Sequence, residues 1–402
     1  MAKDEDDYVI RVVDSTAGVD AMQWNALLAA QRDATPFMRH EYLAALESSG
    51  SAVAATGWYP QFVLLEQANR LVGACALYVK NHSHGEYVFD WSWANAYAQN
   101  GLLYYPKAVV AVPFTPVPGS RLLARNSADR ARVASGLVEW CKTRQLSSLH
   151  VLFSSPQDQD ACVHAGMMLR HTVQFHWNNS VPGYADFNAF LGSLAQDKRK
   201  KIRQERRKVS EAGVSFRWSQ GTTINSSDWE FFFRCYERTY LEHGNAPYLN
   251  RQFFDDLATT MPENWLLFIA ERNGRPIASS LIAIKPSGIR DRAEFVPESQ
   301  GAVAYGRYWG ALERVDCLHF EACYYQPLQW CIDHGYQRFE GGAQGEHKLA
   351  RALLPVMSTS AHWLAHPAFA DAVEKFLARE GEGVSDYLDE LRQRSPMRKT
   401  DN

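Results

Sequence analysis

The chain has 402 residues, of which 46% are hydrophobic and 22% are charged, and its formal net charge is −3. This composition is typical of a globular protein with a sizeable core, and the length suggests two or three domains. The near-neutral charge balance excludes a protein that coats nucleic acid with its whole surface, so any contact with a polyanion should be local.

The cysteines and the N-terminus bear on the cellular compartment. The seven cysteines are odd in number and form no CxxC pair, which predicts reduced thiols in a cytosolic protein. The spacing of Cys317, His319, Cys323 and Cys331 fits no common zinc site. The acidic first ten residues lack the apolar core of a signal peptide, and no apolar run reaches the roughly 18 residues that span a bilayer. We therefore expect a cytoplasmic protein without a transmembrane segment or a metal site.

Two segments of the chain predict β-hairpins. The first runs from 62 to 79 with a polar turn at 67–70, and the second runs from 265 to 285 with Asn273-Gly274 as its turn. The elements predicted after them are a helix over 129–143 and a strand over 147–153 in the first half, and a strand over 302–312, a helix from Pro327 to a Gly335 cap and a strand over 337–342 in the second.

The shared order of elements predicts a duplicated α/β domain, although hairpin-plus-helix order also arises by chance in mixed α/β proteins. Pro182 and Gly183 interrupt the chain between the two halves. We therefore predict an N-terminal domain over 1–180 and a C-terminal domain over 181–402, which contains the proposed site.

A strongly basic helix is predicted near the start of the second half. The segment from Asp197 to Gly213, DKRKKIRQERRKVSEAG, carries eight Lys or Arg residues. Asp197 is a candidate N-cap and Gly213 a candidate residue just beyond the helix end. On a helical wheel, Ile202 and Val209 share a narrow apolar stripe, while the cations cover a broad opposite face.

So much positive charge on one helix favours an anionic partner over a merely solvated face, because like charges three or four residues apart repel one another. Forked Arg side chains suit phosphates in particular. The segment alone does not distinguish a nucleotide-sugar diphosphate, a tRNA backbone and another nucleic acid. The candidate anion-binding residues are Lys198, Arg199, Lys201, Arg203 and Arg206.

Polar and charged residues concentrate between 305 and 351, where they interrupt segments that otherwise resemble core strands. Arg307 lies in an aromatic strand, and His319 and Glu321 would share one face of an extended chain. A glycine-rich loop over 341–345 would allow a ligand to approach backbone N–H groups. Buried charge is costly unless it is paired or used, so the cluster predicts a functional site.

Structural interpretations of the same residues remain open. Arg307 would form a buried ion pair with Glu321 or Glu340, and His319 would be a satisfied core histidine. The basic residues after the glycine-rich loop would lie on a helix surface. The chain contains neither a GxSxG serine-hydrolase motif nor a HExxH zinc motif.

Several long motifs resemble those of a family of predicted bacterial N-acyltransferases called FemAB-like. They include TPFMRHEYLAALESSG, GEYVFDWSWANAY and YYPKAVVAVPFTPVPGSRLL in the first half, and KRKKIRQERRKV, LHFEACYYQ and FEGGAQGEHKLARALLPV in the second. The family is similar to the Fem-type peptidyltransferases, which carry two acetyltransferase-type (GNAT) folds in tandem and attach amino acids from aminoacyl-tRNA to a peptidoglycan precursor. The resemblance implies an α/β (α+β) protein with two tandem GNAT domains, whose mixed sheets are flanked by helices.

The resemblance also implies an N-acyltransferase that joins an activated acyl or aminoacyl group to the amine of an anionic acceptor, such as a nucleotide-sugar. No tightly bound cofactor is expected. The R/Q-x-x-G-x-G/A loop that binds the CoA pyrophosphate in acetyltransferases is absent, which argues against CoA and favours another activated acyl group. The candidate donors are aminoacyl-tRNA and acyl-CoA. Two alternatives remain: acyl-CoA-dependent acylation of a small amine, and a non-catalytic module that binds nucleic acid or a cell-wall precursor.

Acyl transfer to an amine requires a proton acceptor and donors for the oxyanion. Glu321 or His319 is the first candidate for the proton acceptor, and Glu346 and His347 are the second. The predicted contacts with the substrate and its developing charge are Arg307, Tyr324, Tyr325, Gln344, Lys348 and Arg351.

Overall fold

The computed structural model describes residues 8–286, 301–342 and 345–398. The chain forms two compact units, Met1–Thr172 with Met357–Asp386 and Val173–Val356 with Tyr387–Asn402. Three elements contribute residues to both units: β7 (Met168–Asn178), β13 (Leu354–Leu364) and α12 (Pro367–Gln393). The division near residue 180 into two folding domains stays a prediction.

The first unit is a mixed sheet covered by helices. Its strands are β1 (Tyr8–Val13), β2 (Tyr59–Gln67), β3 (Arg70–Lys80), β4 (Lys107–Val110), β5 (Leu123–Ala124) and β6 (Ser148–Val151). Its helices are α1 (Ala21–Ala29), α2 (His40–Ser48), α3 (Trp91–Gln99), α4 (Ser127–Thr143) and α5 (Pro156–His164), with 3-10 turns at Thr16–Gly18, Pro36–Met38 and Ala54–Thr56.

The strand order of the first unit is β1-β2-β3-β4-β6-β13, and β5 pairs with β3. Neighbours from β1 to β4 are antiparallel, whereas β4 and β6 run parallel. Helix α4 packs on this sheet through Val133, Leu137 and Cys141, which lie at helical spacing and are buried with Leu149 and Val151 of β6. The predicted helix over 129–143 is therefore confirmed, and it starts two residues earlier.

The second unit is also a mixed sheet with helices on both faces. Its strands are β8 (Val214–Gln220), β9 (Trp265–Arg272), β10 (Arg275–Lys285), β11 (Val303–Ala311) and β12 (Arg338–Glu340). Its helices are α6 (Phe187–Gly192), α7 (Gln196–Glu211), α8 (Ser226–Glu242), α9 (Arg251–Thr260), α10 (Leu318–Phe320), a π-helix (Glu321–Tyr325) and α11 (Gln326–Asp333), with 3-10 turns at Gly221–Thr223, Pro262–Asn264 and Glu346–Arg351.

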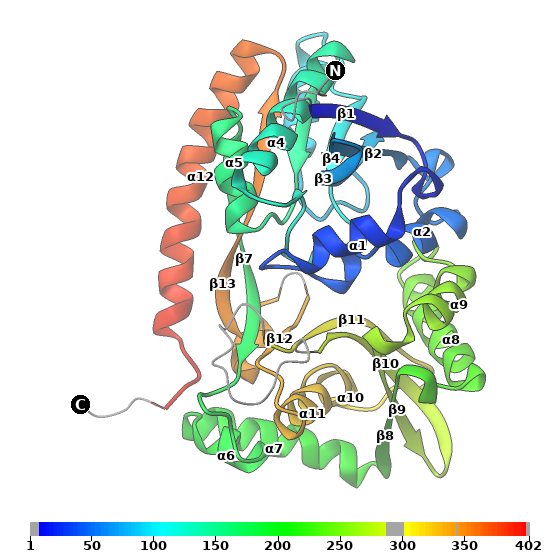
Figure 1. The fold of residues 1–402 in the computed structure, drawn as a ribbon. Helices are drawn as coiled ribbons and strands as arrows, with labels where there is room; N and C mark the ends of the chain where they lie inside the picture. The colour runs from blue at the N-terminus through cyan, green and yellow to red at the C-terminus, as the bar shows by residue number, and fades with distance from the viewer. Residues whose placement is uncertain (1–7, 287–300, 343–344, 399–402) are drawn as a thin grey trace. The chain divides into compact units, whose positions relative to one another are not determined.

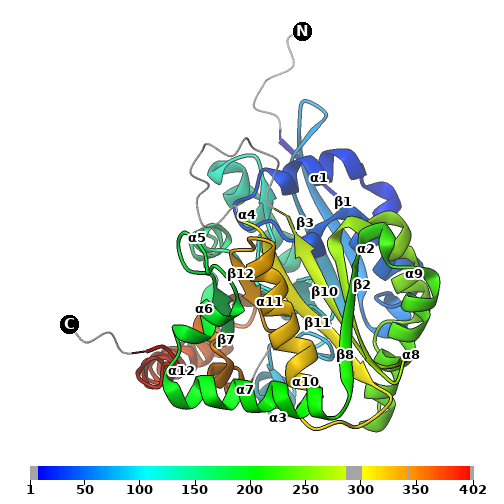
Figure 2. The same ribbon diagram turned by 90° about the horizontal axis from the view of Figure 1, so that it is seen from below.

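The strand order of the second unit is β7-β12-β11-β10-β9-β8, in which only β11 and β12 pair in parallel. Helices α7, α10 and α11 lie on one side of β8–β11, and α8 and α9 lie on the other (Figure 2). Leu266, Phe268 and Ile282 pack with Tyr325 and Leu328 in one buried cluster. The glycine-rich loop and the basic helix therefore belong to the same unit.

Both predicted hairpins are confirmed, as β2–β3 and β9–β10 (Figure 1). Their turns are Ala68-Asn69 and Asn273-Gly274, and all four residues have positive φ. Two consecutive residues with positive φ are characteristic of the type I′ turn, whose twist matches that of the flanking strands.

The basic helix begins earlier than predicted. Its N-cap is Ala195, and Asp197 lies in the first turn, where it pairs with Lys198 at 2.9 Å. The prediction of Asp197 as the N-cap is therefore wrong, although a carboxylate in the first turn interacts favourably with the helix dipole. Gly213 follows the helix with a φ of 74°, as predicted.

The segment from 318 to 333 is helical, and the prediction that His319 and Glu321 share one face of an extended chain is wrong. Leu318, Ala322, Tyr325, Leu328 and Ile332 are among the buried apolar residues of this segment and lie on one side of it. They recur every three or four positions, which is the period of a helix rather than of a strand.

Among the described residues, no helix combines the length and apolar character needed to cross a bilayer.

Candidate functional site

Helix α7 is held to the second unit by an apolar seam and one buried carboxylate. Ile202 and Val209 are buried, as the helical wheel predicted. Glu205 lies on the same side and accepts hydrogen bonds from Arg351 Nη2 at 2.8 and 3.0 Å. It also accepts the hydroxyl of Tyr325. This buried ion pair joins the basic helix to the 3-10 turn that follows the glycine-rich loop.

A second ion pair joins α7 to the π-helix. Arg206 Nε lies 3.1 and 3.2 Å from the two carboxylate oxygens of Glu321, and Gln326 Nε2 donates to Glu321 at 2.7 Å. Glu321 is only 3% exposed. Glu321 and Glu340 are the two predicted partners of Arg307. The structure pairs Glu321 with Arg206, and Glu340 with Arg338 at 3.0 Å.

The outer face of α7 keeps its cations available. Arg199 is half-buried, and Lys200, Lys201 and Arg203 are exposed. None of these four forms an ion pair within the ranges that the structure describes. The helix therefore presents a basic surface on one side while Arg206 serves an internal contact.

Two imidazoles lie near each other beyond the π-helix. The ring centroids of His319 and His347 are 6.5 Å apart, and the Tyr324 hydroxyl lies 3.1 Å from His347 Nε2. Burial, and then the neighbouring His347, lower the pKa of His319 to about 4. Burial, Lys348 and Arg351 also lower the pKa of His347. Both rings are therefore neutral at neutral pH, and each retains a nitrogen lone pair that can accept a proton.

Lys348 places a buried amine beside these rings. It is 3% exposed, and Nζ donates to the carbonyl oxygen of Gly342 at 2.8 Å. Burial lowers the pKa of Lys348 to about 8, so most of the population is an ammonium at neutral pH. A Cβ on Gly341 would lie 2.4 Å from Leu353 Cδ2, which explains the first glycine of the loop. The predicted contact Gln344 lies outside the described residues.

Arg351 and Arg307 occupy different settings. Arg351 is buried, its Nη1 donates to the carbonyl oxygen of His347 at 2.6 Å, and its guanidinium carbon lies 3.4 Å from the centroid of the Phe320 ring. It therefore supports the turn that carries His347. Arg307 is half-buried on β11, with its guanidinium carbon 5.2 Å from the centroid of the Tyr308 ring.

Glu346 points to a different part of the same unit. It accepts a hydrogen bond from the Tyr387 hydroxyl at 2.8 Å and pairs with Arg394 at 3.2 Å. These contacts lower the pKa of Glu346, chiefly through the bond from Tyr387. A carboxylate with a lowered pKa is a weak proton acceptor at neutral pH.

Two features of this unit went unrecognised in the sequence. Glu205 is the first, and its place beside the Ile202–Val209 stripe of the helical wheel is the signal that it would be buried. The π-helix Glu321–Tyr325 is the second, and it has no recognised sequence signal. Such turns are frequent at functional sites.

A separate polar network in the first unit also went unrecognised. Lys107 Nζ, fully buried, donates to Ser83 at 2.7 Å and to Glu86 at 2.8 Å, and it pairs with Asp90. The Tyr104 hydroxyl donates to Asp90 at 2.6 Å. The sequence signal is the presence of Glu86 and Asp90 within the aromatic motif GEYVFDWSWANAY and of Lys107 at the start of the apolar run in YYPKAVV. The network ties the segment after β3 to the sheet.

The mixed sheets flanked by helices confirm the α/β fold class expected from the sequence, that of tandem GNAT proteins. The chain belongs to the FemAB-like family, described as a peptidoglycan biosynthesis/recognition family, whose model matches residues 15–399. A search of curated proteins found no match.

Three solved structures show the same fold at low sequence identity. FemX is 9% identical with a TM-score of 0.54, covering 90% of this chain and 100% of its own. The C-terminal domain of a putative lysylphosphatidylglycerol synthetase from Agrobacterium fabrum is 10% identical with a TM-score of 0.53, covering 90% and 97%. L-PGS from Bacillus licheniformis is 9% identical with a TM-score of 0.52, covering 89% and 97%. The family and the fold together support an acyltransferase-type role.

Replacing Glu205 tests whether one carboxylate fixes α7. Glu205→Gln leaves the Arg351 guanidinium buried without its anion, so we expect a loss of about 3 kcal/mol in the free energy of unfolding, measured by urea denaturation. Glu211→Gln, which removes an exposed pair with Arg207 on the same helix, should cost less than about 0.5 kcal/mol. Equal losses in the two variants would contradict the anchoring role.

Proposed function

We propose that the protein is an N-acyltransferase in which His347 accepts the proton of an attacking amine and Lys348 stabilises the oxyanion. The observation that carries this proposal is the neutral imidazole of His347, 3.1 Å from the Tyr324 hydroxyl, next to the buried ammonium of Lys348. Amide formation needs these two functions side by side, whereas the carboxylates of Glu321 and Glu346 are held by Arg206 and Arg394.

The step follows from the groups present. The amine nitrogen attacks the carbonyl carbon of an ester or thioester, and the carbonyl oxygen becomes an oxyanion. The ammonium of Lys348, held by its hydrogen bond to the carbonyl oxygen of Gly342, supplies the positive charge that would stabilise that oxyanion. The amine proton passes to His347, and collapse of the intermediate expels the alcohol or thiol, which takes the proton back. In this proposal Glu321 holds α7, and His319 is not the base, because burial lowers its pKa to about 4.

The proposed donor is aminoacyl-tRNA and the proposed acceptor is an anionic cell-wall precursor. The outer face of α7 favours a polyanionic donor such as tRNA, since four of its cations have no acidic partner within the described residues. The family description supports an acceptor from peptidoglycan metabolism. A donor of this kind implies that the protein works in the cytoplasm.

A direct assay separates the candidate donors. The purified protein is incubated with a nucleotide-linked peptidoglycan precursor and either a mixture of charged tRNAs or acetyl-CoA, and the amide product is identified by mass spectrometry. We expect the amide product when the donor is charged tRNA and no product when the donor is acetyl-CoA. His347→Gln should lower the rate by a factor of about 100 or more while leaving precursor binding unchanged. Product from acetyl-CoA alone would overturn the donor, and full activity of His347→Gln would overturn the base.

The pH dependence of turnover tests Lys348. Because burial lowers the pKa of Lys348 to about 8, its ammonium is present below that pH and is lost above it. We therefore expect kcat at saturating substrate to fall as the pH rises through about 8. Lys348→Arg keeps its charge throughout this range, so its alkaline decline should move to higher pH or disappear. An unchanged decline in this variant would assign it to another group.

The salt dependence of tRNA binding tests the outer face of α7. Arg199→Gln/Arg203→Gln removes two cations from that face and should reduce the slope of log affinity against log salt concentration by about 1.5. The matched control, Lys142→Gln/Arg144→Gln, removes two cations near the end of α4 and should leave the slope unchanged. Equal effects of the two variants would show that binding follows overall charge rather than α7.

A further inference from the structure

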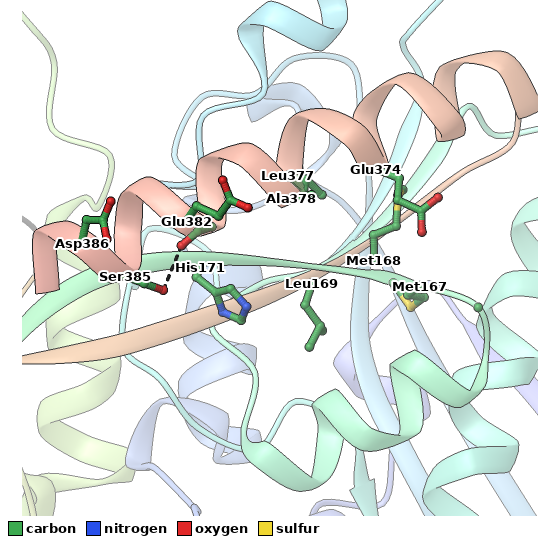
Figure 3. A pocket seen from close by; sticks show the side chains of 12 residues that line it. Met167, Met168, Leu169, His171, Glu374, Leu377, Ala378, Glu382, Ser385 and Asp386 are labelled. Atoms are coloured by element: carbon green, nitrogen blue, oxygen red, sulfur yellow. Dashed lines mark hydrogen bonds between the residues drawn. The ribbon is translucent and has the colours of Figure 1, made fainter. Parts of the chain in front are cut away.

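The first unit contains a pocket that the proposed reaction does not use. It has a volume of about 790 Å³, within the range of small-molecule sites, and lies between α12 and the start of β7 (Figure 3). Its floor is apolar: Met167 and Leu377 are buried, and Met168 and Leu169 lie beside them. All of its lining residues belong to the first unit.

The rim of this pocket is acidic. Glu374, Glu382 and Asp386 line it from α12, and no Lys or Arg occurs among its lining residues. None of the three carboxylates forms an ion pair within the part of the chain that the structure describes. Arg170 lies between the lining residues Leu169 and His171 on β7, but it does not line the pocket and pairs with Glu380 at 2.8 Å. The rim thus carries negative charge that the protein leaves unbalanced.

The carboxylates follow one row of the helix. Positions 374, 378, 382 and 386 are each four residues apart, so they lie above one another on a single face. At 1.5 Å per residue, Glu374 and Glu382 are separated by about 12 Å along the axis, and Glu382 and Asp386 by about 6 Å. The three carboxylates therefore form a line along the helix, with one long and one short interval between them.

The row of α12 next to the carboxylates carries small side chains, which leave space on the helix surface. Gly381 and Ser385 follow Leu377 at four-residue spacing, and Ala378 lies in the acidic row between the two glutamates. A Cβ on Gly381 would meet only His171 Cδ2, at 4.0 Å. Glycine inside a helix is unfavourable relative to alanine, and here packing does not require it. Its effect is to keep the groove open beside the apolar floor.

We propose that this groove binds a linear polyamine. Such a chain alternates ammonium groups with short runs of methylenes, which matches carboxylates at intervals along one wall and an apolar floor beneath them. Like charges four residues apart on a helix repel one another, so a cation between Glu382 and Asp386 removes that repulsion. A compact divalent cation could meet at most two neighbouring carboxylates of this line, and it would leave the Met and Leu floor uncovered.

The test is calorimetric titration of the full chain with spermidine. We expect one site per chain. Glu382→Gln/Asp386→Asn should weaken binding about fivefold or more, because two carboxylate contacts are lost. Asp371→Asn is the matched control, since Asp371 is exposed on the same helix but does not line the pocket. This control should leave the affinity unchanged.

A second variant separates the groove from its charge. Ala378→Leu leaves the net charge unchanged, preserves helix propensity and fills the groove, so it should also weaken spermidine binding about fivefold or more. Three outcomes would overturn the proposal: no effect of Ala378→Leu, a loss with Asp371→Asn equal to that of the double variant, or displacement of spermidine by an equal concentration of Mg²⁺. Octylamine binding more tightly than spermidine would assign the groove to a monovalent amphiphile and overturn it as well.

Discussion

The second unit depends on one buried carboxylate, Glu205. A guanidinium taken out of water needs an anion, and Arg351 finds it in Glu205 of helix α7. The Tyr325 hydroxyl donates to the same carboxylate. Three segments, α7, the π-helix and the 3-10 turn after the glycine-rich loop, therefore meet at a single side chain.

This contact sets the rotation of α7 about its axis. With Glu205 directed inward between Ile202 and Val209, Arg206 reaches Glu321 on one flank. The remaining cations face outward, where solvent or a polyanion can meet them. A helix that reads as uniformly basic thus has one arginine committed to structure and a separate surface available for binding.

Burial acts in the same direction on both kinds of basic group in the candidate site. It lowers the pKa of His319 to about 4 and that of Lys348 to about 8. The two values fall on opposite sides of neutral pH, so neutral imidazoles stand beside an ammonium. Acyl transfer to an amine needs a proton acceptor beside a cationic group that stabilises the oxyanion. The carboxylates of Glu321 and Glu346 are instead engaged in ion pairs with Arg206 and Arg394.

The two units share strand order near their hairpins but use polar groups differently. In the first unit Lys107, Glu86 and Asp90 are buried, and Lys107 pairs with both carboxylates. Burial lowers the pKa of Lys80 to about 7 and raises that of Glu86 to about 7. These charges hold the segment between β3 and α3 against the sheet. The open, acidic surface of this unit lies elsewhere, on α12.

Sequence by itself determined the features that depend on local sterics and periodicity. Asn273-Gly274 specifies its turn because few other residues adopt positive φ readily, and Gly213 ends α7 for the same reason. Ile202 and Val209 define the buried stripe of α7 through helical spacing alone. The family resemblance, carried by long contiguous motifs, extended this to the tandem GNAT fold.

Only the tertiary structure decided which charges meet. Glu205 and Arg351 are 146 positions apart, and Arg206 and Glu321 are 115 apart, so no local pattern relates them. Residues 318–333 carried both a polar alternation and a helical apolar period, and packing of the apolar set against β9 and β10 selected the helix. The acidic row of α12 became the wall of a pocket only because β7 lies opposite it. Partner choice between distant charges depends on the three-dimensional path of the chain, which composition and spacing do not contain.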